Sequence, residues 1–181
     1  VADQGLAAEG RPARGRGAIH RIFSFLKAAT PRGATDLHGA TSGLPPARAG
    51  AITILLTDLW DPAGVEPALT RLAHRGGELH VLHIVDRREL DPSHLSGDLT
   101  LVDSETGEEL AVTVDKDVRA SLRAAATQYF EEVDELCRRR GISLFRIDAA
   151  DPVEERLIDW LRAADEAVRR GGASRLGALR S

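Results

Sequence analysis

The chain lacks the features of a secreted or membrane-embedded protein. It has a single cysteine, Cys137, in 181 residues. No disulfide can therefore form within the chain, and a reducing compartment is the simpler setting. No apolar run approaches the roughly 20 residues of a membrane span, and no signal-peptide core occurs. These absences predict a cytoplasmic location.

Methionine and a strong excess of one charge are also lacking. The chain opens on Val1 and has no methionine, which either a rare start codon or a shortened N-terminus would explain. The 24 basic residues stand against 28 acidic ones, for a net charge of -4, so nothing indicates nucleic-acid binding. An apolar content of 43% is ordinary for a globular protein, and the length suits one domain with a real core.

The common catalytic motifs are missing too. No dinucleotide-binding glycine pattern, Walker A motif, G-x-S-x-G or H-E-x-x-H spacing occurs. His80 and His83 lie three apart on an expected strand, hence on opposite faces, which excludes joint chelation. We predict a polar edge or loop-end role for both. Cys137 is predicted to be a buried small apolar residue rather than a nucleophile.

What is present is an alternation of strands and helices after residue 50. The strands are "AITILL", "ELHVLHIV" and "ISLFRI", and the helices are "VEPALTRLAHRGG", Lys116 to Arg140, and one from "DPVEERLIDWLRAA". This order predicts parallel strands with right-handed crossovers in an open α/β sheet. Gly171 to Ser181 is expected to be a loose tail.

Two shorter helices are expected before the first strand. Residues 1–17 are polar, basic and rich in Gly and Pro, which predicts a flexible segment. "AIHRIFSFLKAA" then predicts a helix with a buried stripe of Ile19, Ile22, Phe23 and Leu26. "ATDLHGATSGL" predicts a second short helix, with Thr35 or Asp36 as its N-cap.

Acidic residues gather where the sheet is expected to end. Asp58, Asp86 and Asp148 each follow an apolar strand, and ligands of open parallel sheets lie at that edge. They could serve a cation or polar-ligand site, or only the polar needs of strand-to-helix loops. Between the second strand and the long helix, "DLTLVDSETGEELAVTV" predicts a hairpin at the same edge.

Several of these stretches together resemble a known family. They are "ITILLTDLWDP", "GGELHVLHIVDRREL", "LTLVDSETGEE", and the Tyr129 helix followed by "CRRRGISLFRI". They are similar to a bacterial family of von Willebrand factor A-like proteins catalogued as domain of unknown function fifty-eight. The resemblance covers roughly residues 18–163, a partial von Willebrand A-like domain. Residues 164–181 would be a helix end and tail.

The resemblance implies a three-layer, doubly wound, mostly parallel sheet with an inserted hairpin. Its upper edge can carry a metal-ion-dependent adhesion site, in which Thr35 would match the threonine and Asp58 the aspartate. The D-x-S-x-S turn of that site is absent here. We therefore expect the first strand, first helix and this turn to precede Val1. Thr35 and Asp58 supply at most two of about six Mg²⁺ ligands, so Mg²⁺ is expected only if the parent protein has the turn.

The resemblance also implies a function. Members accompany MoxR-type AAA ATPases in assembling or maturing other proteins, so we expect a non-enzymatic interaction module whose parent could be membrane-anchored. The expected partner surface comprises Asp61, Asp86, Glu105, Glu108 and Glu109. The alternative is a metal-assisted hydrolase using Asp58, Asp61 and Asp86.

Overall fold

A parallel sheet forms the centre of the molecule. The computed structural model describes residues 10, 12, 14–15, 17–30, 35–61, 63–103 and 105–177. Strands β1 (Ile52–Thr57), β2 (Glu78–Val85) and β5 (Ser143–Asp148) form a three-stranded sheet in the order β1-β2-β5. Both pairings are parallel. The prediction of an α/β fold with a parallel sheet is confirmed.

The predicted helices occur in the expected order, and the short helix α4 (Arg87–Leu90) and the 3₁₀ turn η1 (Pro92–His94) occur in addition and were not predicted. The predicted helices are α1 (Ala18–Ala28), α2 (Leu37–Ser42), α3 (Glu66–His74), α5 (Lys116–Arg140) and α6 (Val153–Gly177). Helix α6 continues past residue 171, where the tail was expected to begin, and residues 178–181 lie outside the described residues. None of the helices in the described part of the chain is both long and apolar enough to cross a bilayer.

Helix α5 shows why the long helix was predictable. The Asp115 carboxylate accepts hydrogen bonds from the backbone N–H groups of Asp117 and Val118, which would otherwise have no partner at the helix start. The helix ends at Gly141, whose φ of 65° is the left-handed conformation that stops helices and that glycine adopts without strain. These two signals bound the helix at the predicted residues.

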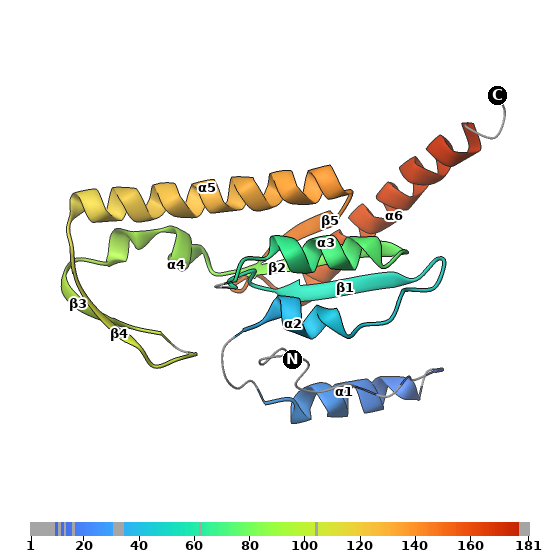
Figure 1. The fold of residues 1–181 in the computed structure, drawn as a ribbon, viewed down its shortest axis with the longest axis horizontal. Helices are drawn as coiled ribbons and strands as arrows, with labels where there is room; N and C mark the ends of the chain where they lie inside the picture. The colour runs from blue at the N-terminus through green and yellow to red at the C-terminus, as the bar shows by residue number, and fades with distance from the viewer. Residues whose placement is uncertain are drawn as a thin grey trace.

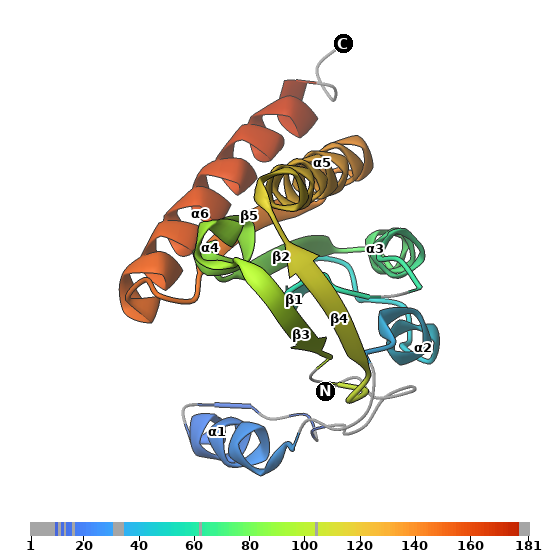
Figure 2. The ribbon, with the colours of Figure 1, turned by 90° about the vertical axis from the view of Figure 1, so that its left-hand side faces the viewer.

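The helices divide between the two faces of the sheet (Figure 2). Helices α2, α3 and α5 lie on one face, while α6 and α1 lie on the other side. The strands advance in one direction, from β1 through β2 to β5, with α3 and α5 as crossovers on one face. Within the described residues the sheet therefore has no point where the strand order reverses.

The hydrophobic core lies on the face covered by α2, α3 and α5. Val65, Leu69 and Leu72 point inward as predicted, and Cys137 is buried. Burial, and then the nearby Asp134 carboxylate, raise the pKa of the Cys137 thiol to about 11, so it stays protonated and unreactive at neutral pH. The cluster consists of Leu37, Leu59, Val65, Ala68, Leu69, Leu72, Leu79, Val81, Val133, Leu136, Cys137 and Ile142.

Two predictions about burial are wrong. The α1 stripe of Ile19, Ile22, Phe23 and Leu26 is 49–57% exposed, and α1 lies apart from the sheet (Figure 1). An amphipathic pattern fixes which side of a helix is apolar, but burial also requires a surface that faces it. His80 and His83 are not edge residues: both are buried, because β2 is the middle strand and both its faces are covered.

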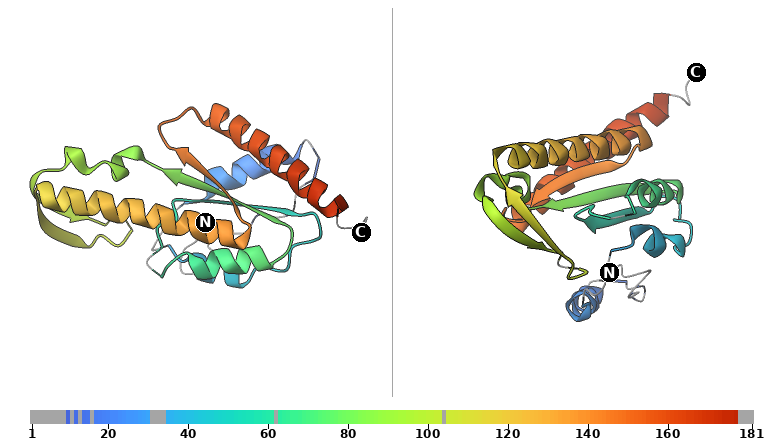
Figure 3. Two further views of the ribbon diagram at one scale, coloured as in Figure 1. Left: turned by 90° about the horizontal axis from the view of Figure 1, so that it is seen from above. Right: turned by 60° about the vertical axis from the view of Figure 1, so that its left-hand side comes forward.

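The predicted hairpin is present. Strands β3 (Gly97–Val102) and β4 (Glu109–Val114) pair in antiparallel fashion. Gly107, with a φ of 74°, closes the turn by donating its N–H to the carbonyl of Asp103 at 2.8 Å. The hairpin projects beyond the sheet, beside the N-terminal half of α5 (Figures 1 and 3). It is the excursion that the sequence predicts.

Candidate functional site

The turn that follows β1 is held in a strained conformation. Leu59 is fully buried and has a φ of 61°, which is uncommon for a residue with a branched side chain and costs about 1–3 kcal/mol. Its N–H donates to the Thr57 hydroxyl at 2.9 Å, and the Tyr129 hydroxyl donates to its carbonyl. The Trp60 ring stacks on Tyr129 with centroids 5.0 Å apart. The turn is thus fixed from both the strand and α5.

His83, on strand β2, makes a hydrogen bond to the same turn. Its Nε2 lies 3.0 Å from the Asp58 carbonyl, and its Nδ1 accepts from Arg146 Nε at 3.2 Å. This arrangement assigns the proton of the neutral ring to Nε2. Burial, and next the Arg146 charge, lower the pKa of His83, so it stays neutral. The turn is therefore anchored to the two other strands of the sheet.

The two acids of this turn have different roles. Asp58 is exposed, and one of its carboxylate oxygens accepts from the Trp60 N–H at 3.1 Å. Asp61 accepts from Ala63 N–H at 2.8 Å and from Leu37 N–H at 2.9 Å. Asp61 thus ties the turn to the start of α2. Of the two, Asp58 keeps more of its carboxylate available to a ligand.

The acids at the carboxyl ends of β2 and β5 are paired with arginines; Asp86 follows β2, and Asp148 is the last residue of β5. Asp86 caps α4 and lies 2.5 Å from Arg88 Nη2, and the hydrogen bonds from that guanidinium lower the pKa of Asp86 to about 2. Asp148 is buried and lies 2.6 Å from Arg87 Nε. It also accepts from Ala150 N–H at 2.8 Å. Both carboxylates therefore stabilise the loops that follow their strands.

The hairpin tip contacts the start of α2. Thr35 N–H and its hydroxyl donate to the two carboxylate oxygens of Glu105, at 2.9 and 2.6 Å. These residues are 70 positions apart in the sequence. Glu108 and Glu109 are exposed on the same hairpin. Within the predicted partner surface, Glu105 is thus also a structural contact.

The residues present do not fit an adhesion-type metal site. Thr35 and Asp58 line one cavity of about 420 Å³ between α2 and β1, but the Thr35 hydroxyl is directed at Glu105. Among the described residues, no group of three or more His, Cys, Asp or Glu side chains could hold a metal ion. Two ligands are too few for the octahedral shell of Mg²⁺. Asp58, Asp61 and Asp86 likewise do not form the cluster that the hydrolase alternative requires.

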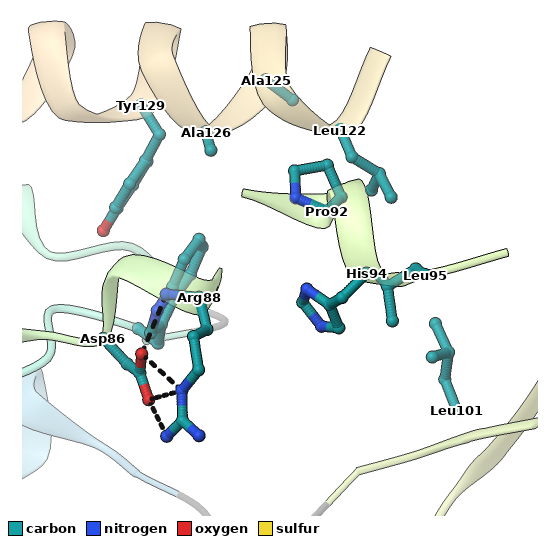
Figure 4. Close-up of a pocket in the computed structure, with 11 residues that line it drawn as sticks. Asp86, Arg88, Pro92, His94, Leu95, Leu101, Leu122, Ala125, Ala126 and Tyr129 are labelled. Carbon is teal, nitrogen blue, oxygen red and sulfur yellow. Dashed lines mark hydrogen bonds and ion pairs between the residues drawn. The ribbon is translucent and has the colours of Figure 1, made fainter. Parts of the chain in front are cut away.

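A larger apolar groove lies beside the turn and was not predicted (Figure 4). Its volume is about 750 Å³, and it lies between the hairpin, the α4–η1 segment, the first half of α5 and the turn after β1. Most of its lining is apolar, and the exceptions are the Asp86–Arg88 ion pair and the His94 imidazole. We call it the hairpin groove; it is lined by Trp60, Asp86, Arg88, Pro92, His94, Leu95, Leu101, Leu122, Ala125, Ala126 and Tyr129.

The groove escaped the sequence analysis because its walls come from four separate segments. Leu101 alternates along β3 and Leu122 follows the α5 pattern, so each fits an ordinary core position. The one available signal was Trp60 in "DLWD", a large aromatic residue placed between two acids in a loop. Such a residue is enriched at protein interfaces.

Comparison with known proteins identifies the family. Neither a search of curated proteins nor a search of solved structures found a match. The family model described as "Protein of unknown function DUF58" matches residues 6–133, from before α1 into α5. This match includes the turn after β1, the hairpin and every residue that lines the hairpin groove. The chain belongs to the DUF58 family of proteins of unknown function.

Proposed function

We propose that this chain is a non-enzymatic protein-interaction module that works with a MoxR-type AAA ATPase in the assembly or maturation of other proteins. The observation that carries the proposal is the hairpin groove. The ATPase as partner comes from the family resemblance of the sequence. The groove adds the surface on which such a partner would bind.

The groove has the composition of a protein-docking surface. Trp60, Leu101 and Leu122 are 49%, 43% and 44% exposed, so large apolar side chains meet solvent around one concavity. Binding energy at protein interfaces concentrates on such anchors, and tryptophan is prominent among them. The groove also lies near the carboxyl ends of the parallel strands, where α/β sheets bind their ligands. A partner would insert one or two apolar side chains here.

Exposed acids lie on two of the elements that form the groove. Glu108 and Glu109 are exposed on the hairpin, with Glu109 on the Val102 face, which is turned away from the groove, and Asp58 is exposed on the turn after β1. Acidic groups near an apolar anchor speed the encounter with a basic patch and add specificity. The partner surface we propose is therefore an apolar anchor flanked by Lys or Arg.

We also propose that the chain is part of a von Willebrand A-like domain with a doubly wound sheet. A doubly wound sheet would need strands on the free side of β1, and β1 is an edge strand in the described sheet. Mg²⁺ would bind only with a D-x-S-x-S turn from the parent protein, joined to Thr35 and Asp58. We further propose that the module acts in the cytoplasm. The hydrolase alternative gains no support, because Asp61 and Asp86 are already bonded within the chain.

A pair of variants on β3 tests the groove. Leu101 lines it, while its neighbour Val102 points to the opposite face of the hairpin and is 60% exposed. We expect Leu101→Asp to weaken binding to a purified MoxR-type ATPase from the same organism at least about tenfold, or ~1.4 kcal/mol. Val102→Asp should bind within about twofold of the wild-type chain. Biolayer interferometry measures both.

The results distinguish a wrong partner from a wrong docking surface. If the wild-type chain does not bind the ATPase, the proposed partner is wrong. If Leu101→Asp and Val102→Asp both bind like the wild-type chain, the groove is not the docking surface. Far-ultraviolet circular dichroism of both variants shows that any loss of binding does not come from unfolding.

A further inference from the structure

One row of β1 side chains is left open on the sheet. Ile52, Ile54 and Leu56 alternate with half-buried residues and are 61%, 45% and 65% exposed. Ile54 is in register with His80 of β2, so the two side chains share a face. His80 contacts the Trp160 ring of α6, with centroids 5.8 Å apart. The open row therefore lies on the α6 face of the sheet.

The open row lacks the features that normally keep an edge strand from pairing with another molecule. Helix α6 packs on that face over β2 and β5, and no other described element covers β1 there. Strand β1 carries no charged residue and lies at the edge of the sheet. Exposed edge strands normally carry charges, proline or a bulge that prevent pairing with another molecule. A contiguous apolar row at such an edge marks an interaction surface.

Helix α1 has the complementary properties. Its apolar residues Ile19, Ile22, Phe23 and Leu26 recur at the spacing of one helix face and are about half exposed. Its charged side chains are basic, Arg21 and Lys27, and it has no acidic residue. It lies on the same side of the sheet as α6 (Figure 2). It is thus a basic amphipathic helix whose apolar face is about half exposed among the described residues.

An acidic side chain flanks the open row. Glu78 is in register with Ile52 on the same face, and its side chain is 53% exposed. On α1, Lys27 lies at the edge of the apolar stripe, next to Phe23 on the helix surface. The two surfaces are therefore both apolar, and Glu78 and Lys27 give them opposite charges.

We propose that two copies of this chain form a dimer in which α1 of each copy packs against the β1 row of the other. Within one chain, the described position of α1 leaves its own stripe exposed. In a dimer with two-fold symmetry, the same α1–β1 contact forms twice. Together the two contacts bury both stripes and both rows, as in other symmetric dimers. The dimer uses the face of the sheet opposite the core and is independent of the hairpin groove, but further strands beside β1, as in a doubly wound sheet, would compete with it for that edge.

Sedimentation equilibrium on the full chain tests the dimer. The wild-type chain, of 19.5 kDa, should show twice that mass at micromolar concentration. Phe23→Asp in α1 and Ile54→Asp in β1 should each raise the dimer dissociation constant at least about tenfold, because each places a charge in an apolar contact. Ser24→Asp, on the polar side of α1, is the matched control and should remain dimeric.

A mixing experiment identifies the contact. Phe23→Asp keeps an intact β1 row, and Ile54→Asp keeps an intact α1. Their equimolar mixture should therefore form heterodimers with one intact contact, at concentrations where each variant alone is monomeric. Circular dichroism confirms that each variant is folded; if Ile54→Asp does not fold, Ile54→Ser replaces it.

Four results would overturn the proposal. They are a monomeric wild-type chain over the whole concentration range, open-ended aggregates instead of a closed dimer, variants that dimerise like the wild type, and a mixture that stays monomeric. A wild-type monomer that instead binds phosphatidylglycerol vesicles, and loses this binding in Phe23→Asp, would assign α1 to a lipid surface.

Discussion

The two faces of the sheet differ in how completely they are covered. On one face, α2, α3 and α5 enclose a cluster of fully buried side chains that includes Leu59, Leu69 and Val81. On the other, α6 covers β2 and β5 but leaves Ile54 and its neighbours on β1 exposed. An apolar strand therefore need not be buried on both faces. We infer that the covered face stabilises the fold, and that the open face is available for association.

The largest effect should come from the covered face. Leu69 is fully buried in α3, and we expect Leu69→Ala to lower the free energy of unfolding by about 2–5 kcal/mol, because a cavity is left behind. Ile54→Ala on the open face should change it by only about 0.5 kcal/mol under monomeric conditions. Urea denaturation measures both. Equal losses would show that the two faces contribute alike.

A smaller effect is expected at the turn after β1. Tyr129→Phe removes the hydroxyl that donates to the Leu59 carbonyl but keeps the stacking on Trp60. We expect a loss of about 0.5–1.5 kcal/mol in the free energy of unfolding. Gln128→Ala, which removes an exposed hydrogen bond to Glu132 on the same helix, is the control and should cost less than about 0.5 kcal/mol. A Tyr129→Phe variant as stable as the control would mean that the strained turn does not need this bond.

The smallest effect is a pH dependence from His83. Its pKa is lowered in the folded chain, first by burial and then by Arg146, so the unfolded chain binds the proton more tightly. The contribution of His83 to stability is therefore complete above its unfolded pKa of about 6.5 and is lost as the pH falls below that value. His83→Gln should flatten the change in urea midpoint between pH 7 and pH 5, relative to the wild type. His20→Gln, an exposed variant on α1, is the control and should show the same change in urea midpoint as the wild type. If His83→Gln also shows that change, the argument is wrong.

Much of the fold could be predicted because local signals were strong. The apolar pattern on one helix face predicted α5, whose ends the Asp115 cap and Gly141 explain, and the two alternating runs around "SETGEE" located the hairpin. The parallel sheet followed from alternation of strands and helices. The exposure of the α1 stripe and the burial of His80 and His83 could not be predicted, because both depend on which elements lie opposite.

The site was predicted less well, for a similar reason. Asp58 and Asp86 follow their strands as expected, and Asp148 is the last residue of β5, but the hydrogen-bond partners of these acids were not visible in the sequence. The bonds between Thr35 and Glu105 join residues 70 positions apart. Whether the acids belong to a partner surface remains a prediction. The positive φ of Leu59 has no signature, because leucine rarely adopts it.

Hydrogen–deuterium exchange tests the central claim, that a protein partner docks in the hairpin groove, most directly. The chain would be measured alone and with saturating MoxR-type ATPase. We predict slower exchange on binding in residues 86–103 and 118–129, which contain most of the groove lining, and little change in β5, none of whose residues lines the groove. Unchanged exchange in both groove segments, with slowing elsewhere in the chain, would contradict the claim.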